Sequence, residues 1–340
     1  MNTSLTSPWE IDESDFPKQA TYSEQVRFLL RYAILAPSSR NMQPWRFAAD
    51  HRTVWIHSDE ERWSRVGDPD RRELYLGLGA ALENLLVAAE HFGFRHDVQY
   101  FPIPGYPALA VVVELHPDGR PYTERPPELF EAIRDRHTAH GLFSDRTVSE
   151  SDRRRLLSCC IGEGLRLDLF PTKDARETVD ALHRKAAELL FADPAWRREL
   201  GHCIGTGVLG TSWPLAQIAE FTVSHLNLGR QIAQHETAAL MSAPLVGLVS
   251  TVDDHPDSQV RAGQVLERLW LRATSLGLSL QPMSEALEVS TLRHELARLI
   301  PVLGMYPQQT VRLGYARKGR EHHSPRRELE EVMLVGENRA

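Results

Sequence analysis

The side chains best suited to chemistry stand in one short loop, residues 36 to 47, which carries hydroxyl and amide groups between two prolines. The polar members of this loop are Ser38, Ser39, Asn41 and Gln43, and the prolines are Pro37 and Pro44. Hydroxyls and amides both donate and accept hydrogen bonds, which suits a flat polar heterocycle better than a phosphate or a metal. The loop is therefore a candidate cradle for a cofactor ring, and an ordinary turn with local side-chain bonds is the alternative.

The cysteines do not suggest a comparable site. There are three of them, Cys159, Cys160 and Cys203. An odd number argues against a disulfide framework, and their positions lack the paired spacing of metal ligands. We therefore expect no metal and treat the three as small, mostly buried side chains.

Length and charge restrict the class of protein. The chain has 340 residues, 42% of them apolar, a net charge of -7 and a pI of about 6.1. This length fits one large domain or two of about 150 residues, and the acidic balance argues against a nucleic-acid surface. No apolar run reaches the roughly 18 to 20 residues of a membrane span, and the amino terminus lacks an export signal. We expect a cytoplasmic protein with a small-molecule partner, without nucleic acid or membrane.

The elements that position the loop alternate between helical and extended patterns. A polar arm occupies residues 1–20, and Thr21 with Glu24 forms a capping box that opens a helix ending at Pro37. Short strands are expected at 45–49, 53–57 and 108–115, with a turn at 116–119. Between them, residues 74–92 predict a helix that is apolar on nearly every face and ends at Gly93.

The second part of the chain contains a similar set of elements. A helix after the proline pair at 126–127 leads into a cationic, donor-rich loop at 134–140. A helix capped by Ser149 or Ser151, strands at 165–170 and 245–250 and a buried helix at 259–276 follow. Residues 174–243 are helical in pattern, with breaks near Pro194 and Pro214, and could cover a site as a lid.

The two buried helices match each other at an offset of 184 residues. The matching pairs are Gly79 with Gly263, Leu82 with Leu266, Glu83 with Glu267, Leu85 with Leu269, Ala89 with Ala273, and Gly93 with Gly277. Each helix has an apolar strand beside it. This repeat predicts a dimer written as one polypeptide, whose halves pack through these helices.

The chain resembles the nitroreductase superfamily of flavin proteins, and within it the fused, two-half Acg-like branch. The resembling segments are A-P-S-S-R-N-M-Q-P-W-R-F at 36–47, G-L-G-A-A-L-E-N-L at 77–85, R-H-T-A-H at 136–140, A-G-Q-V-L-E-R-L at 262–269, V-R-L-G-Y at 311–315 and S-P-R-R-E-L-E-E-V at 324–332. The resemblance implies an α+β fold of two pseudo-symmetric halves, each with a mixed sheet flanked by helices. We place the first half at 21–122 and the second at 123–335, the latter with the insertion at 174–243.

The resemblance also implies an FMN site between the halves. By position, the phosphate and ribityl contacts would be Arg136, Thr138, His140 and Arg326, with His137 and Ser324 beside them. The ring contacts would be Pro37, Ser38, Ser39, Asn41 and Gln43, and the flavin edge would face Gln281, Pro282, Met283 and Ser284. Arginine forks and a hydroxyl suit a phosphate dianion, although a solvated surface is the alternative for both arginines. No catalytic side chain is singled out.

Two departures from the family pattern predict one FMN per chain. The first half has no basic cradle before its opening helix, and the second half passes through Gly162 and Gly164 without a P-S-S loop. Only one complete site can be assembled. Because the family's dimer is contained in one chain, the protein could act as a monomer.

The function expected from the resemblance is an FMN-dependent oxidoreductase that passes a hydride, through the flavin N5, to or from a small, flat, electron-poor substrate. NAD(P)H is a candidate reductant, although no Gly-rich dinucleotide fingerprint follows a strand. Two alternatives stay open: a protein that binds or sequesters FMN without turnover, and a flavin dehydrogenase of a natural product.

Overall fold

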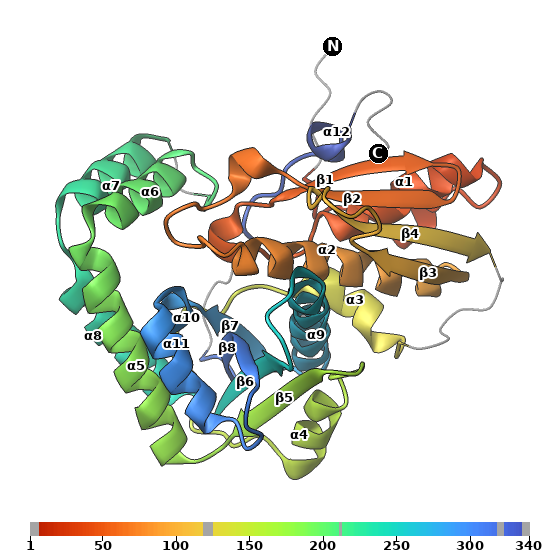
Figure 1. Cartoon of the computed structure of the whole chain (residues 1–340). Coiled ribbons are helices and arrows are strands. Elements are labelled where there is room, and N and C mark those ends of the chain that lie inside the picture. The colour runs from red at the N-terminus through yellow and green to blue at the C-terminus, as the bar shows by residue number, and fades with distance from the viewer. Residues whose placement is uncertain (1–6, 118–124, 211–212, 318–322, 335–340) are drawn as a thin grey trace.

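Two halves with the same strand order make up the chain (Figure 1). The computed structural model describes residues 7–117, 125–210, 213–317 and 323–334. The first half contains α1 (Tyr22–Ala33), β1 (Trp45–Asp50), β2 (Thr53–Ser58), α2 (Arg72–His91), β3 (Phe94–Tyr100) and β4 (Leu109–Pro117), and α3 (Glu128–Asp135) packs against its core. The second contains α4 (Glu150–Leu157), β5 (Leu165–Phe170), β6 (Leu245–Thr251), α9 (Pro256–Ser275), β7 (Ser279–Met283), α10 (Glu285–Glu288), α11 (Ser290–Leu296), β8 (Tyr306–Gly314) and α12 (Leu329–Val332).

Each half has one four-stranded sheet, and the two sheets have corresponding orders, β1-β2-β4-β3 and β5-β6-β8-β7. All ladders within them are antiparallel, so the expected mixed sheets are wrong. Among the described residues, parallel pairing occurs only as two isolated bridges, Phe47 with Met333 and Thr138 with Leu280. A single bridge is too short to form a strand, which explains why neither sheet becomes mixed.

Helices α2 and α9 cross at the centre of the molecule and join the halves (Figure 1). Their glycines make the crossing close: a Cβ added at Gly79 would lie 1.9 Å from the carbonyl oxygen of Val260, and one at Gly263 would lie 2.2 Å from that of Leu76. The contacts are reciprocal, as expected of two elements related by a pseudo-two-fold axis. The predicted packing of the halves through these helices is confirmed.

The hydrophobic core follows the same division. One cluster fills the first half and includes Val260 and Leu271 from α9, and another fills the second half and includes Leu76 from α2. Each central helix therefore contributes side chains to the core of the other half. The boundary that we expected between residues 122 and 123 lies outside the described residues, and the division at these numbers stays a prediction.

Two local expectations differ from the structure. Strand β3 was not predicted, because Arg95, Asp97 and Gln99 lie on its exposed side at the sheet edge and hide its pattern. The expected turn at 116–119 begins too early, since β4 continues through Pro117. The rest of that turn falls outside the described residues.

The helical insertion forms a layer on one flank of the second half (Figure 1). It comprises α5 (Lys173–Ala192), α6 (Pro194–Gly205), α7 (Trp213–His225) and α8 (Gly229–Ser242). Helix α5 packs against α8, α10 and α11, and α6 packs against α7. Across the part of the chain that the structure describes, no helix combines the length and apolar character needed to cross a bilayer.

Candidate functional site

The loop after α1 has an unusual backbone. Arg40, Asn41 and Gln43 have φ angles of 49°, 55° and 52°, in the left-handed region that side-chain-bearing residues seldom adopt. The Ser38 hydroxyl accepts a hydrogen bond of 2.8 Å from the backbone N–H of Gln43, which closes the loop on itself. Backbone strain of this kind persists where surrounding contacts fix it, and it is concentrated at ligand sites.

Contacts from distant segments hold this loop. The Asn41 amide nitrogen donates to the carbonyl oxygens of Val208, at 2.6 Å, and Pro325, at 2.9 Å, while its oxygen accepts from Arg326 at 2.8 Å. The Gln43 side-chain oxygen accepts from the backbone N–H of Arg327 at 2.8 Å. The first-half loop is thereby bonded to the insertion and to the carboxy-terminal segment.

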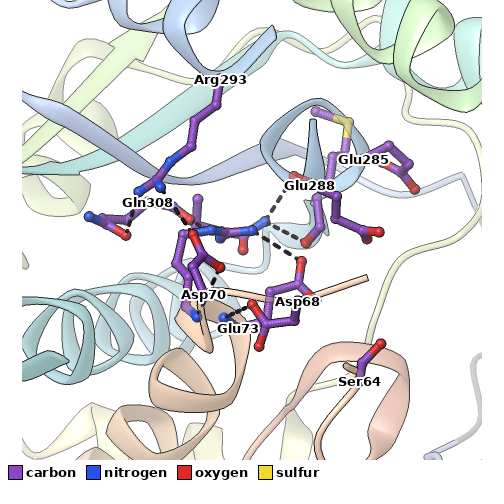
Figure 2. A network of polar contacts seen from close by, with 12 residues as sticks. Ser64, Asp68, Asp70, Glu73, Glu285, Glu288, Arg293 and Gln308 are labelled. Carbon is purple, nitrogen blue, oxygen red and sulfur yellow. Dashed lines mark hydrogen bonds and ion pairs between the residues drawn. The ribbon is translucent and has the colours of Figure 1, made fainter. Parts of the chain in front are cut away.

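A second set of contacts ties the loop to the second half, and Figure 2 shows part of it. Arg40 donates to Ser64 at 2.7 Å and to both oxygens of Glu288, at 3.0 and 3.1 Å. Nearby, Asp68 accepts from two backbone N–H groups at the start of α2 within the first half. Arg293 of the second half donates to Asp254 and, across the interface, to Asp70 at 3.3 Å. Burial raises the pKa of Glu288, and the charge of Arg40 opposes this rise.

Arg136 and Arg326, both expected to bind a phosphate, lie together beneath this loop. The side chain of Arg136 is 2% exposed. Each guanidinium donates to the same acceptor, the carbonyl oxygen of Leu35, and both distances are 3.1 Å. The Trp9 ring lies beside both, with its centroid 4.8 Å from the Arg326 guanidinium carbon and 6.0 Å from that of Arg136.

One buried carboxylate, Glu267 on α9, faces the two arginines. Its Oε1 is 3.5 Å from the Nε of Arg136, and its side chain is fully buried. Neither Glu267 oxygen has a hydrogen-bond partner among the described residues, and the Nε atoms of Arg136 and Arg326 are equally unsatisfied. Burial raises the pKa of Glu267 to about 7, while the arginines oppose that rise.

Two guanidinium groups, of Arg136 and Arg326, therefore face one carboxyl group, that of Glu267, and the cluster has an excess of positive charge. Burial lowers the pKa of both arginines, and the charge of Arg136 lowers that of Arg326 further. Burial also lowers the pKa of His323, which stacks on Trp9 with a centroid separation of 4.1 Å. Buried cations with unsatisfied N–H groups favour the binding of an anion, because an anion supplies both the missing negative charge and the missing hydrogen-bond acceptors.

Glu83, the counterpart of Glu267 at the offset of 184 residues, lies in a different environment. It accepts from the Nε and Nη2 atoms of Arg125 at 2.8 and 3.0 Å, and from those of Arg268 at 2.7 and 2.8 Å. Despite burial, these guanidiniums hold the pKa of Glu83 far below its usual value. One of the two equivalent positions is thus a closed ion-pair network, and the other contains unsatisfied donors and acceptors.

A second group of expected site residues surrounds Arg312 on β8. Its guanidinium donates to the carbonyl oxygens of Ala139, Gly141 and Ala239, at 2.8 to 3.0 Å, and to the side chain of Gln281. A cavity of about 130 Å³ opens here. It is lined by β7, the 136–140 segment and the insertion, including His140, Gln281, Pro282, Met283, Glu236 and Glu285. Burial and the neighbouring Glu285 raise the pKa of Glu236 to about 8.

The remaining expected residues lie in or beside these two groups. Ser324 accepts from Arg326 and from the Trp9 indole through its backbone oxygen, and the Thr138 backbone pairs with Leu280 of β7. His137 contacts the carbonyl oxygen of Asp135, and Ser284 contacts Gln309. Pro37 and Ser39 are half-buried in the strained loop. The short segment 136–140 connects the arginine pair to the Arg312 cavity.

Sequence reasoning missed three residues of this site: Trp9, Glu267 as a site residue, and Arg312. Glu267 could have been found, because the internal repeat pairs it with Glu83. Arg312 lies in one of the resembling segments. Trp9 belongs to the polar arm and carried no signal. No group of residues able to hold a metal ion occurs among those that the structure describes.

Comparisons with known proteins agree with the resemblance. No family model matches the chain. The Mycobacterium tuberculosis H37Rv protein named NAD(P)H nitroreductase Rv3131 is 28% identical over 322 residues, covering 92% of this chain and 91% of its own length. The M. tuberculosis H37Rv protein named NAD(P)H nitroreductase acg is 27% identical, with coverages of 94% and 98%. The resemblance to the nitroreductase superfamily and its Acg-like branch is confirmed.

Two further similarities are more distant. PigM of Serratia sp., named a probable NAD(P)H nitroreductase, is 24% identical over 93% of this chain and 94% of its own length. A nitroreductase from Desulfitobacterium hafniense with bound FMN aligns with 62% of this chain and 98% of its own, at a TM-score of 0.42 and 15% identity. NfnB of Mycobacterium smegmatis, solved in complex with NADPH, gives a TM-score of 0.40 at 16% identity, over 62% of this chain and 98% of its own.

Proposed function

We propose that this protein is an FMN-dependent oxidoreductase that uses NAD(P)H as reductant and acts on a small, flat, electron-poor substrate. One observation carries the proposal: two arginines with unsatisfied buried N–H groups, Arg136 and Arg326, converge on one carbonyl oxygen and one unsatisfied carboxylate. Such a cluster fits a phosphate group. The names of the M. tuberculosis relatives support the same activity.

The residues around the cluster supply the other parts of an FMN site. Arg136, Arg326 and Thr138 bind the phosphate and ribityl chain, with His137 and Ser324 adjacent. The strained loop, through Pro37, Ser38, Ser39, Asn41 and Gln43, covers the ring, and the segment Gln281–Ser284 with His140 faces its edge. When bound, the flavin supplies hydride transfer through N5. The side chains bind the cofactor, orient it and exclude water from its faces.

One flavin per chain follows from the inequivalence of the two glutamates. Arg125 and Arg268 each form a bidentate contact with the Glu83 carboxylate, so their Nε and Nη2 atoms are not available to a phosphate. At Glu267 the corresponding donors are unsatisfied. A protein with two tightly bound flavins per chain would contradict this assignment.

Anaerobic reduction tests the proposal directly. The flavin-loaded protein is mixed with NADH and, separately, with NADPH, and the flavin absorbance is followed. Rapid bleaching by at least one of the two nucleotides is expected. A chain that binds no flavin would refute the proposal.

Binding of FMN without turnover is the second candidate, and one observation favours it. Residues of α5 and α8 line the cavity beside Gln281 and Met283, where the flavin edge is proposed to lie. These helices could close that face to substrates. Easy bleaching by dithionite, with none by either nucleotide, would support this alternative.

A further inference from the structure

A cavity larger than the one beside Arg312, of about 490 Å³, borders the strained loop after α1. It is surrounded by residues of this loop, of the link that precedes α2 (residues 59–71), of α6 and of the carboxy-terminal segment (residues 323–334). Its lining residues include Met42, Gln43, Arg62, Trp63, Val208 and Arg327. Gln43 and Arg326 also line it, so the cavity adjoins the proposed flavin site without coinciding with it.

Three arginines meet at one carboxylate beside this cavity, and two of them, Arg62 and Arg327, line it. A single oxygen of Asp59, Oδ2, is 2.8 Å from Arg46, 3.2 Å from Arg327 and 4.0 Å from Arg62. One negative charge therefore faces three positive charges. Burial and the positive charge of Arg62 lower the pKa of Arg327, and Asp59 opposes this shift.

Three acidic residues, Glu61, Glu199 and Glu331, also line the cavity. Glu199 is occupied by the backbone N–H groups of Val66 and Gly67, at 3.0 and 2.9 Å, and by the Ser64 hydroxyl. The Glu331 carboxylate accepts from the backbone N–H of Glu328 at 3.2 Å, as part of a capping box. Glu199 also lies 3.8 Å from Arg40. Among the described residues, none of the three carboxylates lies within ion-pair distance of Arg46, Arg62 or Arg327.

We infer that this cavity binds the 2′-phosphoadenosine part of NADPH, with Arg62 and Arg327 on the 2′-phosphate; the inference rests on the proposed function. A terminal phosphate monoester has a charge of about −1.5 to −2 at neutral pH, which matches the excess of about two positive charges around Asp59. A bridging pyrophosphate has less charge on each phosphorus and fits less well.

The rest of the lining suits the adenosine. Trp63, Met42 and Val208 offer aromatic and apolar surface for a flat base. Because the cavity shares Gln43 and Arg326 with the proposed flavin site, a dinucleotide bound here starts beside the cofactor that it reduces. The arginines then select NADPH over NADH, since NADH lacks the group that they bind.

Calorimetric titration of the purified, flavin-loaded protein with adenosine 2′,5′-bisphosphate tests the inference. We expect the wild-type protein to bind it, and to bind adenosine 5′-monophosphate at least about tenfold more weakly. Arg62→Gln should weaken binding of the bisphosphate by about tenfold, and Arg62→Lys by less, because the ammonium keeps the charge.

The matched control is Arg166→Gln. Arg166 lies on β5, has the same exposure as Arg62 (33%), pairs with Asp168 at 2.6 Å and does not line the cavity. Its replacement removes the same charge and should leave binding unchanged. Flavin absorbance after gel filtration verifies that each variant retains its cofactor site.

Three outcomes of the titration would overturn the inference: no binding of the bisphosphate by the wild type, equal affinity for the two nucleotides, or equal losses in Arg62→Gln and Arg166→Gln. These outcomes are separate from the test of the proposed function. Flavin that is reduced equally well by NADH and NADPH would refute the NADPH preference and leave the oxidoreductase standing. Absence of bound flavin would refute the oxidoreductase, and the same titration is then performed on the flavin-free protein.

Discussion

Replacing Glu267 by glutamine in the flavin-free protein should stabilise the fold at pH 8 and change it little at pH 5. Glu267 is fully buried and lacks hydrogen-bond partners among the described residues. Burial raises the pKa of its carboxyl from 4.5 to about 7. The folded protein consequently keeps a proton that the unfolded chain releases, and ionisation above that pKa costs folding free energy.

The sign and size follow from this difference in pKa. Below pH 4.5 the carboxyl is protonated in both states, and it contributes no pH dependence. As the pH rises from 4.5 to about 7, only the unfolded chain loses the proton, so the wild-type protein loses about 3 kcal/mol of stability, all of it by pH 8. The amide introduced by Glu267→Gln has no such titration. The variant should thus gain about 3 kcal/mol over the wild type at pH 8, and about 1 kcal/mol or less at pH 5.

Glu83→Gln is the matched control, and its effect should have the opposite sign. Arg125 and Arg268 hold the pKa of Glu83 below its usual value, so its stabilising contribution is present above the unfolded pKa and is lost as the pH falls. Removing this charge leaves two buried guanidiniums without their partner, which costs about 3 to 5 kcal/mol at neutral pH.

Equilibrium urea unfolding at pH 5 and pH 8, followed by tryptophan fluorescence, measures both differences against the wild type. Because a chain of this size can unfold in more than one step, the midpoints of a second probe such as circular dichroism should coincide before free energies are compared. The reasoning fails if Glu267→Gln destabilises the protein at pH 8, or if its difference from the wild type does not grow between the two pH values.

Three further predictions concern the flavin and the interface. Arg326→Ala should weaken FMN binding by roughly 10- to 100-fold, because a charge-assisted contact to the phosphate is lost; quenching of flavin fluorescence measures it, and unchanged affinity would exclude Arg326 from the site. FMN affinity should fall as the pH rises through about 7 in the wild type, since ionised Glu267 then competes for the arginines; Glu267→Gln should lack this component, which a parallel titration of both proteins isolates. Gly263→Ala should lower the melting temperature strongly, because its Cβ would lie 2.2 Å from a backbone oxygen, whereas Gly277→Ala, whose Cβ meets open space at a φ of 70°, should cost only about 1 kcal/mol; equal shifts would argue against the close crossing of α2 and α9.

Local patterns in the sequence determined most of the secondary structure. The capping box of Thr21 and Glu24 begins α1, and the continuous apolar run from Leu74 gives α2, since burial on all sides leaves no polar face to conceal the element. Strand β3 escaped prediction because an edge strand exposes alternate residues, and their charges resemble those of a loop. The repeat at an offset of 184 residues also revealed which helices join the halves.

What the repeat could not reveal is how its two halves differ. Glu83 and Glu267 occupy equivalent positions, yet one receives four guanidinium hydrogen bonds and the other receives none among the described residues. Their partners come from segments far away in the chain: Arg125 and Arg268 for Glu83, and Arg136 and Arg326 near Glu267. Such encounters depend on the path of the whole chain, which no local pattern encodes.

The sequence by itself therefore determined the helices and strands, the internal duplication and the candidate site residues. Only the tertiary structure decided which of these residues contact one another. It brought Trp9 of the arm against Arg326, fixed three left-handed residues in the loop after α1, and placed three arginines on Asp59. The physical reason is that hydrophobic patterning acts over a few residues, whereas the balance of buried charge depends on all segments that pack around a site.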